Sequence, residues 1–167
     1  MTTWNSEYQT QIELQNLLEN LDTDHIEYAT QVLSQSTYSL TGFHLITFAF
    51  HLVSSVGIRP QKIDNYISLI SNLVNTQSTF DLLPNFIFRI LKSRICDKDV
   101  YSENSAEVLF YVKMVINHLI PTYSVLMFFK ELMDDTPQYF QLLFWVFILI
   151  SPILKTDSPA TYIEVSN

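Results

Sequence analysis

Apolar side chains recur every three or four positions along most of this chain, which is the spacing of one face of an α-helix. The clearest stripe follows Arg59-Pro60 and contains Ile63, Tyr66, Ile67, Ile70, Leu73 and Val74. Proline suits a first helical turn and disfavours helical geometry at the residue before it, so a helix is predicted to start at Pro60. Ile67 and Ile70, in the middle of the stripe, are predicted to be buried.

The same spacing predicts further helices, with Ser, Asp, Asn and Pro at the joints between them. They cover approximately residues 4–21, 24–33, 40–56, 78–95, 108–119, 123–133 and 136–152. Asp24 is expected to cap the second helix, and Gly57 to end the third at its C′ position.

The later helices also carry start and stop signals. The fifth is expected to begin at Ser78, with Asp81 completing a weak capping box and Pro84 in its first turn or two. Pro121 is expected to end the sixth, and Thr136-Pro137 to begin the eighth.

Glycine is nearly absent, since Gly42 and Gly57 are the two in 167 residues. Tight hairpins, phosphate-binding loops and nucleophile elbows depend on glycine. We therefore predict an all-α fold in which about eight helices form antiparallel pairs, in a compact bundle or a short solenoid-like stack. We assign residues 1–157 to this helical domain. We expect residues 158–167, where Ser158-Pro159 repeats the helix-start signal, to be the start of a further helix or a linker to a C-terminal region.

The charge of the chain excludes some classes of partner. The formal net charge is −8, and the nine Lys and Arg residues are scattered singly. Nucleic-acid binding needs clustered positive charge, so no nucleic-acid partner is expected. Cys96 is the single cysteine, and the first residues lack the charged and apolar regions of a secretory signal. These features favour a cytoplasmic protein.

The histidines do not have the spacing of a metal site. His44 and His51 share a helix face but lie seven residues apart, about 10.5 Å along the axis. One ion needs ligands three or four residues apart on a helix, and His25 and His118 are isolated. His44, Thr47, His51 and Ser54 instead form a polar or partner-facing stripe along an otherwise apolar helix.

The polar loop from Asp97 to Asn104 begins like a calcium loop and then departs from that pattern. With Asp97 at position 1, Asp99 fits position 3, but Tyr101, Ser102 and Val108 replace required ligands or the required glycine. We therefore expect neither a metal nor another cofactor.

No catalytic motif is found along the chain. Glu131, Asp134 and Asp135 are interpreted as acids serving the start of the next helix rather than as an acid–base pair. Cys96 follows Arg94 but has no histidine nearby in sequence, so a half-buried, unreactive thiol is expected. No catalytic residue is assigned, and the protein is not expected to be an enzyme.

Residues 139–154 read YFQLLFWVFILISPIL and are apolar on every helix face between Leu142 and Ile150. A bilayer span needs about 20 such residues, and a run this short is more typical of a buried core helix. Two alternatives stay open: the segment docks onto a following domain, or it inserts into or docks on a membrane.

The phrase LVSSVGIRPQKIDNYISLISNL, at residues 52–73, resembles the N-terminal helical region of trichomonad-type (protist) ankyrin-repeat proteins. The similarity covers approximately residues 43–160 and continues through residues 86–91, 100–103 and 139–147, then Ser151-Pro152 and residues 155–157. The ankyrin signature TPLHxA does not occur in the chain, so the repeats themselves would lie beyond it.

This resemblance implies a helical head for an ankyrin array, and it transfers no catalytic or ligand-binding residue. We therefore expect a non-catalytic protein-interaction or scaffolding module with unknown protein partners. The protein's own C-terminal ankyrin repeats are one candidate partner. The alternative is a peripheral membrane-associated helical protein that inserts or docks through residues 142–150.

Overall fold

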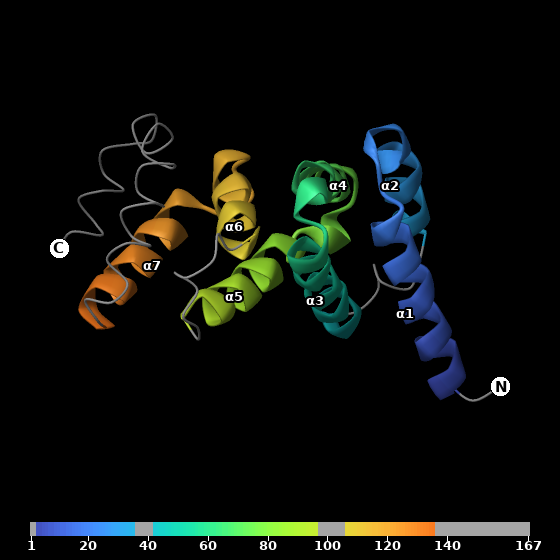
Figure 1. The fold of residues 1–167 in the computed structure, drawn as a ribbon, viewed down its shortest axis with the longest axis horizontal. Coiled ribbons are helices and arrows are strands. Elements are labelled where there is room, and N and C mark those ends of the chain that lie inside the picture. The colour runs from blue at the N-terminus through green and yellow to red at the C-terminus, as the bar shows by residue number, and fades with distance from the viewer. Residues whose placement is uncertain (1–2, 36–41, 97–105, 136–167) are drawn as a thin grey trace. The chain divides into compact units, whose positions relative to one another are not determined.

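The computed structural model describes residues 3–35, 42–96 and 106–135, and in these ranges every regular element is a helix. The α-helices are α1 (Thr3–Glu19), α2 (Ile26–Ser34), α3 (Gly42–Ile58), α4 (Ile63–Thr76), α5 (Leu83–Cys96), α6 (Ala106–Ile116) and α7 (Thr122–Asp135), shown in Figure 1. Short 3₁₀ turns cover Thr23–His25, Pro60–Lys62 and Ser78–Phe80. The predicted all-α fold is confirmed.

The chain divides into two compact units, Met1–Ser93 and Arg94–Asn167, with the division inside α5. We call these unit 1 and unit 2. The predicted boundary between residues 157 and 158 lies outside the described residues, as does the predicted eighth helix, so both stay predictions.

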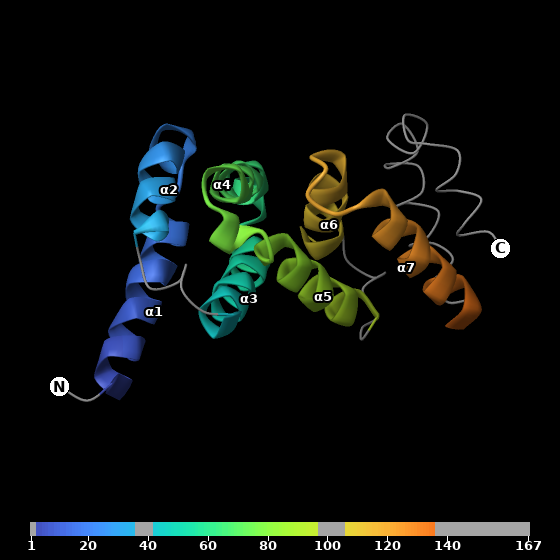
Figure 2. The ribbon, with the colours of Figure 1, turned by 180° about the vertical axis from the view of Figure 1, so that it is seen from behind.

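Unit 1 stacks one helix pair on another. The first pair is α1 and α2, and the second pair is α3 and α4. α1 packs against α3, and α2 packs against α4. Figures 1 and 2 show this arrangement from opposite sides. Pairs stacked in this way are the building principle of α-solenoids. The interior between them is apolar and includes the fully buried Leu18, Phe48, Leu52, Tyr66 and Ile70.

The helix after Arg59-Pro60 forms as the sequence predicts. Pro60 lies in the 3₁₀ turn that leads directly into α4. The predicted stripe faces the core, and Ile67 and Ile70 are both buried. Val74, at the edge of the stripe, is only half-buried.

The preceding helix ends differently from the prediction. α3 continues through Gly57 to Ile58, and Gly57 has a negative φ rather than the left-handed geometry of a C′ glycine. The proline ring disfavours the α region for the residue before it, so Arg59 leaves the helix with φ −129° and ψ 69°. Pro60, and not the glycine, therefore ends α3.

Two predicted caps are also wrong. Asp22, not Asp24, caps the turn before α2, because its carboxylate accepts hydrogen bonds from the backbone N–H groups of Asp24 and His25. The fifth helix begins at Leu83, and Ser78 instead opens a separate 3₁₀ turn. Pro84 lies in the first turn of α5, as predicted.

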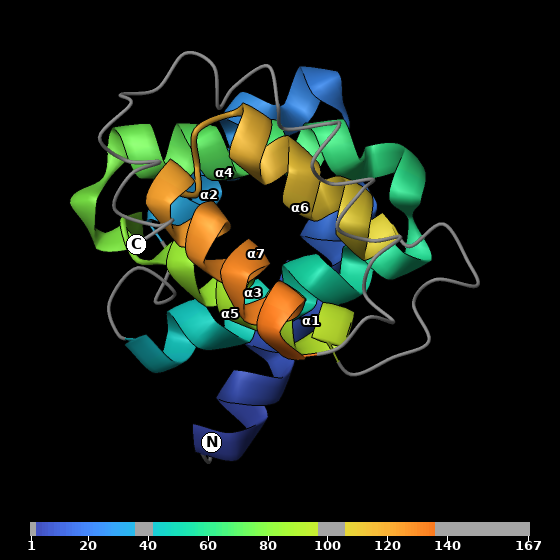
Figure 3. The same cartoon turned by 90° about the vertical axis from the view of Figure 1, so that its left-hand side faces the viewer.

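In unit 2, α6 and α7 are consecutive helices that run in roughly opposite directions (Figure 3). Their contact includes the rings of Tyr111 and Phe128, whose centroids are 5.7 Å apart at an interplanar angle of 75°. This edge-to-face geometry is favourable for aromatic pairs.

The end of α6 is a Schellman motif rather than the predicted stop at Pro121. His118 takes the left-handed position with φ 57°, which glycine usually occupies. The N–H of Leu119 donates to the carbonyl of Met114 at 2.9 Å, and the N–H of His118 donates to that of Val115 at 3.0 Å. These two bonds satisfy carbonyls that the last helical turn leaves without partners.

Candidate functional site

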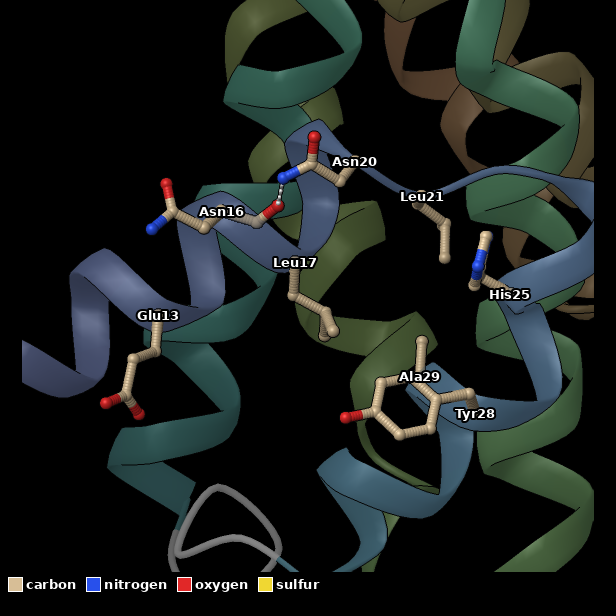
Figure 4. A pocket seen from close by; sticks show the side chains of 8 residues that line it. All are labelled: Glu13, Asn16, Leu17, Asn20, Leu21, His25, Tyr28 and Ala29. Atoms are coloured by element: carbon tan, nitrogen blue, oxygen red, sulfur yellow. Dashed lines mark hydrogen bonds between the residues drawn. The ribbon is translucent and has the colours of Figure 1, made fainter.

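A shallow groove with a volume of about 320 Å³ lies between α1 and α2 in unit 1. Figure 4 shows Leu17 of α1 pointing toward Ala29 and the Tyr28 ring of α2. Apolar and polar side chains share the lining, which consists of Glu13, Asn16, Leu17, Asn20, Leu21, His25, Tyr28 and Ala29. Tyr28 is 62% exposed although it is a large aromatic residue. We call this feature the α1–α2 groove.

The end of the groove near the turn between the helices is held by Asp22. Its Oδ1 accepts hydrogen bonds of 3.0 Å from the N–H groups of Asp24 and His25, and lies 2.5 Å from Nδ1 of the His25 ring. The bond to the His25 side chain holds the pKa of the Asp22 carboxyl below its ordinary value. Three interactions at one oxygen fix the turn from which α2 begins.

The joint between α3 and α4 fixes the C-terminal end of α1. Arg59 Nη2 lies 2.6 Å from a carboxylate oxygen of Glu19, and Lys62 Nζ donates to the carbonyls of Glu19 and Leu21 at 2.7 Å each. Cations are favourable at a helix C-terminus because the carbonyl dipoles make it negative. The Arg59-Pro60 phrase therefore connects the two helix pairs.

Tyr66 adds a buried contact to this joint. Its hydroxyl donates a 3.0 Å hydrogen bond to the carbonyl of Leu18, inside unit 1. Burial raises the pKa of the phenol above its ordinary value. The neutral hydroxyl remains a donor over the whole physiological pH range, so α1 stays attached to α4 at this point.

Sequence reasoning missed the α1–α2 groove, although the charge distribution carried a signal. Residues 1–58 contain six Asp or Glu and no Lys or Arg, whereas the remaining residues contain eleven acids and all nine Lys and Arg. The six acids all lie between the start of α1 and the end of α2. A charge of −6 is thus concentrated on one helix pair.

α3 presents an unexpected surface. Ile46, Phe50, Ser54 and Ile58 follow one another at every fourth position, and all four are exposed, Phe50 at 49% and Ile58 at 65%. We call these four residues the α3 row. The predicted polar stripe is turned partly inward, because His44, Thr47 and His51 are half-buried. Desolvation lowers the pKa of His51 below its ordinary value.

The other candidates from the sequence do not assemble into a chemical site. Across residues 3–35, 42–96 and 106–135, no three His, Cys, Asp or Glu side chains are placed to hold a metal ion together. His25 and His118 are exposed and belong to different units. Glu131 and Asp134 are exposed near the end of α7.

Several expectations fall outside the described residues. The loop at 97–104, the segment 139–154 and residues 158–167 are among them, and the side chains of Cys96 and Asp135 are not described. Among the helices that are described, none combines the length and apolar character that a membrane crossing requires.

No family model, no curated protein and no solved structure matches this chain. The stacked helix pairs, the α1–α2 groove and the α3 row are therefore the observations from which a function is inferred.

Proposed function

We propose that this chain is a non-catalytic protein-interaction or scaffolding module of the cytoplasm and the helical head of a longer ankyrin-repeat protein. The α3 row is the observation that carries the proposal. Single exposed apolar residues are common on protein surfaces, but large ones in register along one helix are typical of interaction sites. Ile46, Phe50 and Ile58 have that register.

The stacked pairs of unit 1 suit this role. Stacked helix pairs bury one side of each helix and leave the other as an extended surface that partners can bind. In the α3 row, Phe50 offers an aromatic anchor, and the residue types that most often dominate binding energy include large aromatics. A partner helix or loop lying along α3 could bury all three apolar members together.

The connection to ankyrin repeats rests on the Arg59-Pro60 phrase and on the helix-pair architecture. Ankyrin repeats are themselves helix pairs of about 33 residues that stack in one direction. A reading frame that continues beyond codon 167 into such repeats would support this part of the proposal. A frame that encodes an unrelated domain would contradict it, without affecting the interaction role.

Site-specific photo-crosslinking tests the interaction role. Benzoylphenylalanine in place of Phe50 is expected to give a discrete adduct with one protein or with the chain's own C-terminal repeats. The same group at Gln31, an exposed position of α2, serves as the control. Purified wild-type chain should compete the adduct away, whereas chain carrying Ile58→Asp should not.

The crosslinking result at position 50 decides whether the α3 row is an interaction surface. A specific adduct that obeys the competition rule supports an interaction module. If position 50 gives no adduct, or gives the same diffuse set of adducts as position 31, the α3 row is not an interaction surface and the proposal is wrong.

A further inference from the structure

We infer that the α1–α2 groove binds a basic, amphipathic helix of a partner protein. This inference rests on the proposed role as an interaction module, and it adds a second surface together with the chemistry of its ligand. It uses none of the residues of the α3 row.

The shape of the groove suits a helix. Two adjacent helices leave a furrow between them, and a third helix fills such a furrow with side chains spaced three and four apart. Leu17, Leu21 and Ala29 supply apolar lining, and Tyr28 projects an aromatic ring at the edge. Val32, one turn beyond Tyr28, extends the exposed apolar edge along α2.

Polar side chains share the lining of the α1–α2 groove with the apolar ones. Asn20 donates its side-chain amide to the carbonyl of Asn16 at 2.9 Å, which keeps this part of α1 hydrogen-bonded within itself. Glu13 and His25 lie toward opposite ends of the lining in Figure 4. A ligand helix therefore meets apolar side chains from both helices with polar side chains beside them, which favours an amphipathic sequence with apolar residues along one face.

The charge around the groove determines the sign of the partner. Glu13, Asp24 and Glu27 are exposed acids on this helix pair, in addition to Asp22. The nearby cations Arg59 and Lys62 are engaged with Glu19 and with backbone carbonyls at the end of α1. The groove therefore lies in a negative field, which attracts Lys and Arg and repels acidic partners.

The same field excludes other occupants. A second copy of this helix pair would bring two groups of acids together, and like charges facing one another across an interface oppose association. Nucleic acid and anionic lipid surfaces are repelled for the same reason. A basic helix satisfies both the apolar lining and the surrounding charge.

The experiment uses the full chain and a synthetic peptide of about 18 residues, long enough to become helical on binding. Leu at helical spacing forms one face of the peptide, and Lys fills the other positions. A second peptide has Glu in place of every Lys. Fluorescence anisotropy measures affinity, and amide chemical shifts of labelled protein locate the site.

The Lys peptide is expected to bind and to shift the amide signals of residues in α1 and α2. Its affinity should be lower in about 500 mM salt than in about 50 mM salt, because salt screens the attraction between charges.

Matched variants distinguish binding in the groove from non-specific attraction between the peptide and the acidic protein. Tyr28→Ser and Glu13→Lys should each weaken binding about tenfold. Tyr123→Ser and Glu131→Lys make the same chemical changes at exposed positions of α7, and should change affinity less than about twofold. Asp24→Lys provides a second charge reversal, in the turn between α1 and α2, should Glu13→Lys fail to fold.

Three outcomes would overturn the inference: equal binding of the two peptides, shifts located away from α1 and α2, or equal losses in the groove and α7 variants. Any of these, with a specific Phe50 crosslink still present, removes the groove but leaves the interaction module. Groove binding without a Phe50 crosslink supports the groove while removing the α3 row.

Discussion

α3 and α4 are consecutive helices of unit 1, and both contribute to its core, but they distribute their apolar side chains differently. α4 keeps Ile63, Tyr66, Ile67, Ile70 and Leu73 on the buried side and polar residues on the other. α3 is apolar around most of its circumference, so it buries Phe48 and Leu52 while Phe50 and Ile58 remain exposed.

The two helices differ in how many of their large apolar side chains the core takes up. In α4 the buried stripe uses almost all of the helix's large apolar residues, which leaves a polar surface with little capacity for binding. In α3 the core needs only part of the apolar residues, and the remainder form the α3 row. A helix with more apolar surface than its core can bury is therefore the place to look for a partner.

The strongest test compares two phenylalanines of α3 that are two positions apart. Phe48 is fully buried and Phe50 is 49% exposed. Phe48→Ala should lower the free energy of unfolding by about 3–5 kcal/mol, because it leaves a cavity. Phe50→Ala should lower it by less than about 1 kcal/mol. Urea denaturation of both variants measures the difference, and equal losses would show that the α3 row is part of the core.

The stripe of α4 gives the next largest effect. Ile67→Ala and Ile70→Ala should each lower the free energy of unfolding by about 2–5 kcal/mol. Ser68→Ala, at an exposed position of the same helix, should change it by no more than about 0.5 kcal/mol. If the denaturation midpoint stayed the same in both isoleucine variants, the assigned buried side of α4 would be wrong.

A smaller effect on stability is expected at two helix ends, where Gly57 has helical geometry and His118 has left-handed geometry. Gly57 lies within the last turn of α3 with helical geometry, and His118 occupies the left-handed end of α6. Gly57→Ala should stabilise unit 1 by about 0.5–1 kcal/mol, and His118→Gly should stabilise unit 2 by a similar amount. Thermal melts of the two variants test this, with His118→Ala as a control that should not stabilise. Destabilisation by Gly57→Ala would show that the surroundings of α3 require a residue without a side chain there.

The half-buried polar stripe of α3 predicts the smallest effect, which depends on pH. Burial lowers the pKa of His51 in the folded protein, so the unfolded chain binds a proton more readily. The contribution of His51 to stability is then fully present above its unfolded pKa of about 6.5, and is lost as the pH falls through the folded pKa.

His51→Gln should therefore lose less stability than the wild type between about pH 7 and about pH 5. Urea midpoints of both proteins at the two pH values measure the difference, in which the contributions of the other histidines cancel. Identical pH dependence would mean that His51 is as accessible to protons in the folded state as in the unfolded chain.

Much of the fold could be predicted from local patterns. The start of α4 at the 3₁₀ turn of Pro60, the position of Pro84 and the burial of Ile67 and Ile70 all follow from proline geometry and helical spacing. The caps were less predictable, since Asp22 and Asp24 are both suitable residues and only the chain path decides which carboxylate meets the free N–H groups. Likewise, nothing local to His118 indicates that it adopts a left-handed conformation.

The two proposed interaction surfaces were not predictable in the same way. The acidic charge of the first 58 residues is visible in the sequence, but the groove that it surrounds exists only because α1 and α2 fold side by side. The α3 row was hidden because an all-round apolar helix gives no indication of which side faces the core.

The sequence by itself determined that this protein is helical and where most of its helices lie, because helix formation depends on residues within a few positions of one another. Tertiary structure alone decided that α1 meets α3, that Arg59, Lys62 and Tyr66 hold the end of α1, and that Phe50 is exposed while Phe48 is buried. Those outcomes depend on contacts between residues far apart in the sequence, 40 to 48 positions for the hydrogen bonds of Arg59, Lys62 and Tyr66. The side chains in such contacts must fit together in volume and hydrogen bonding.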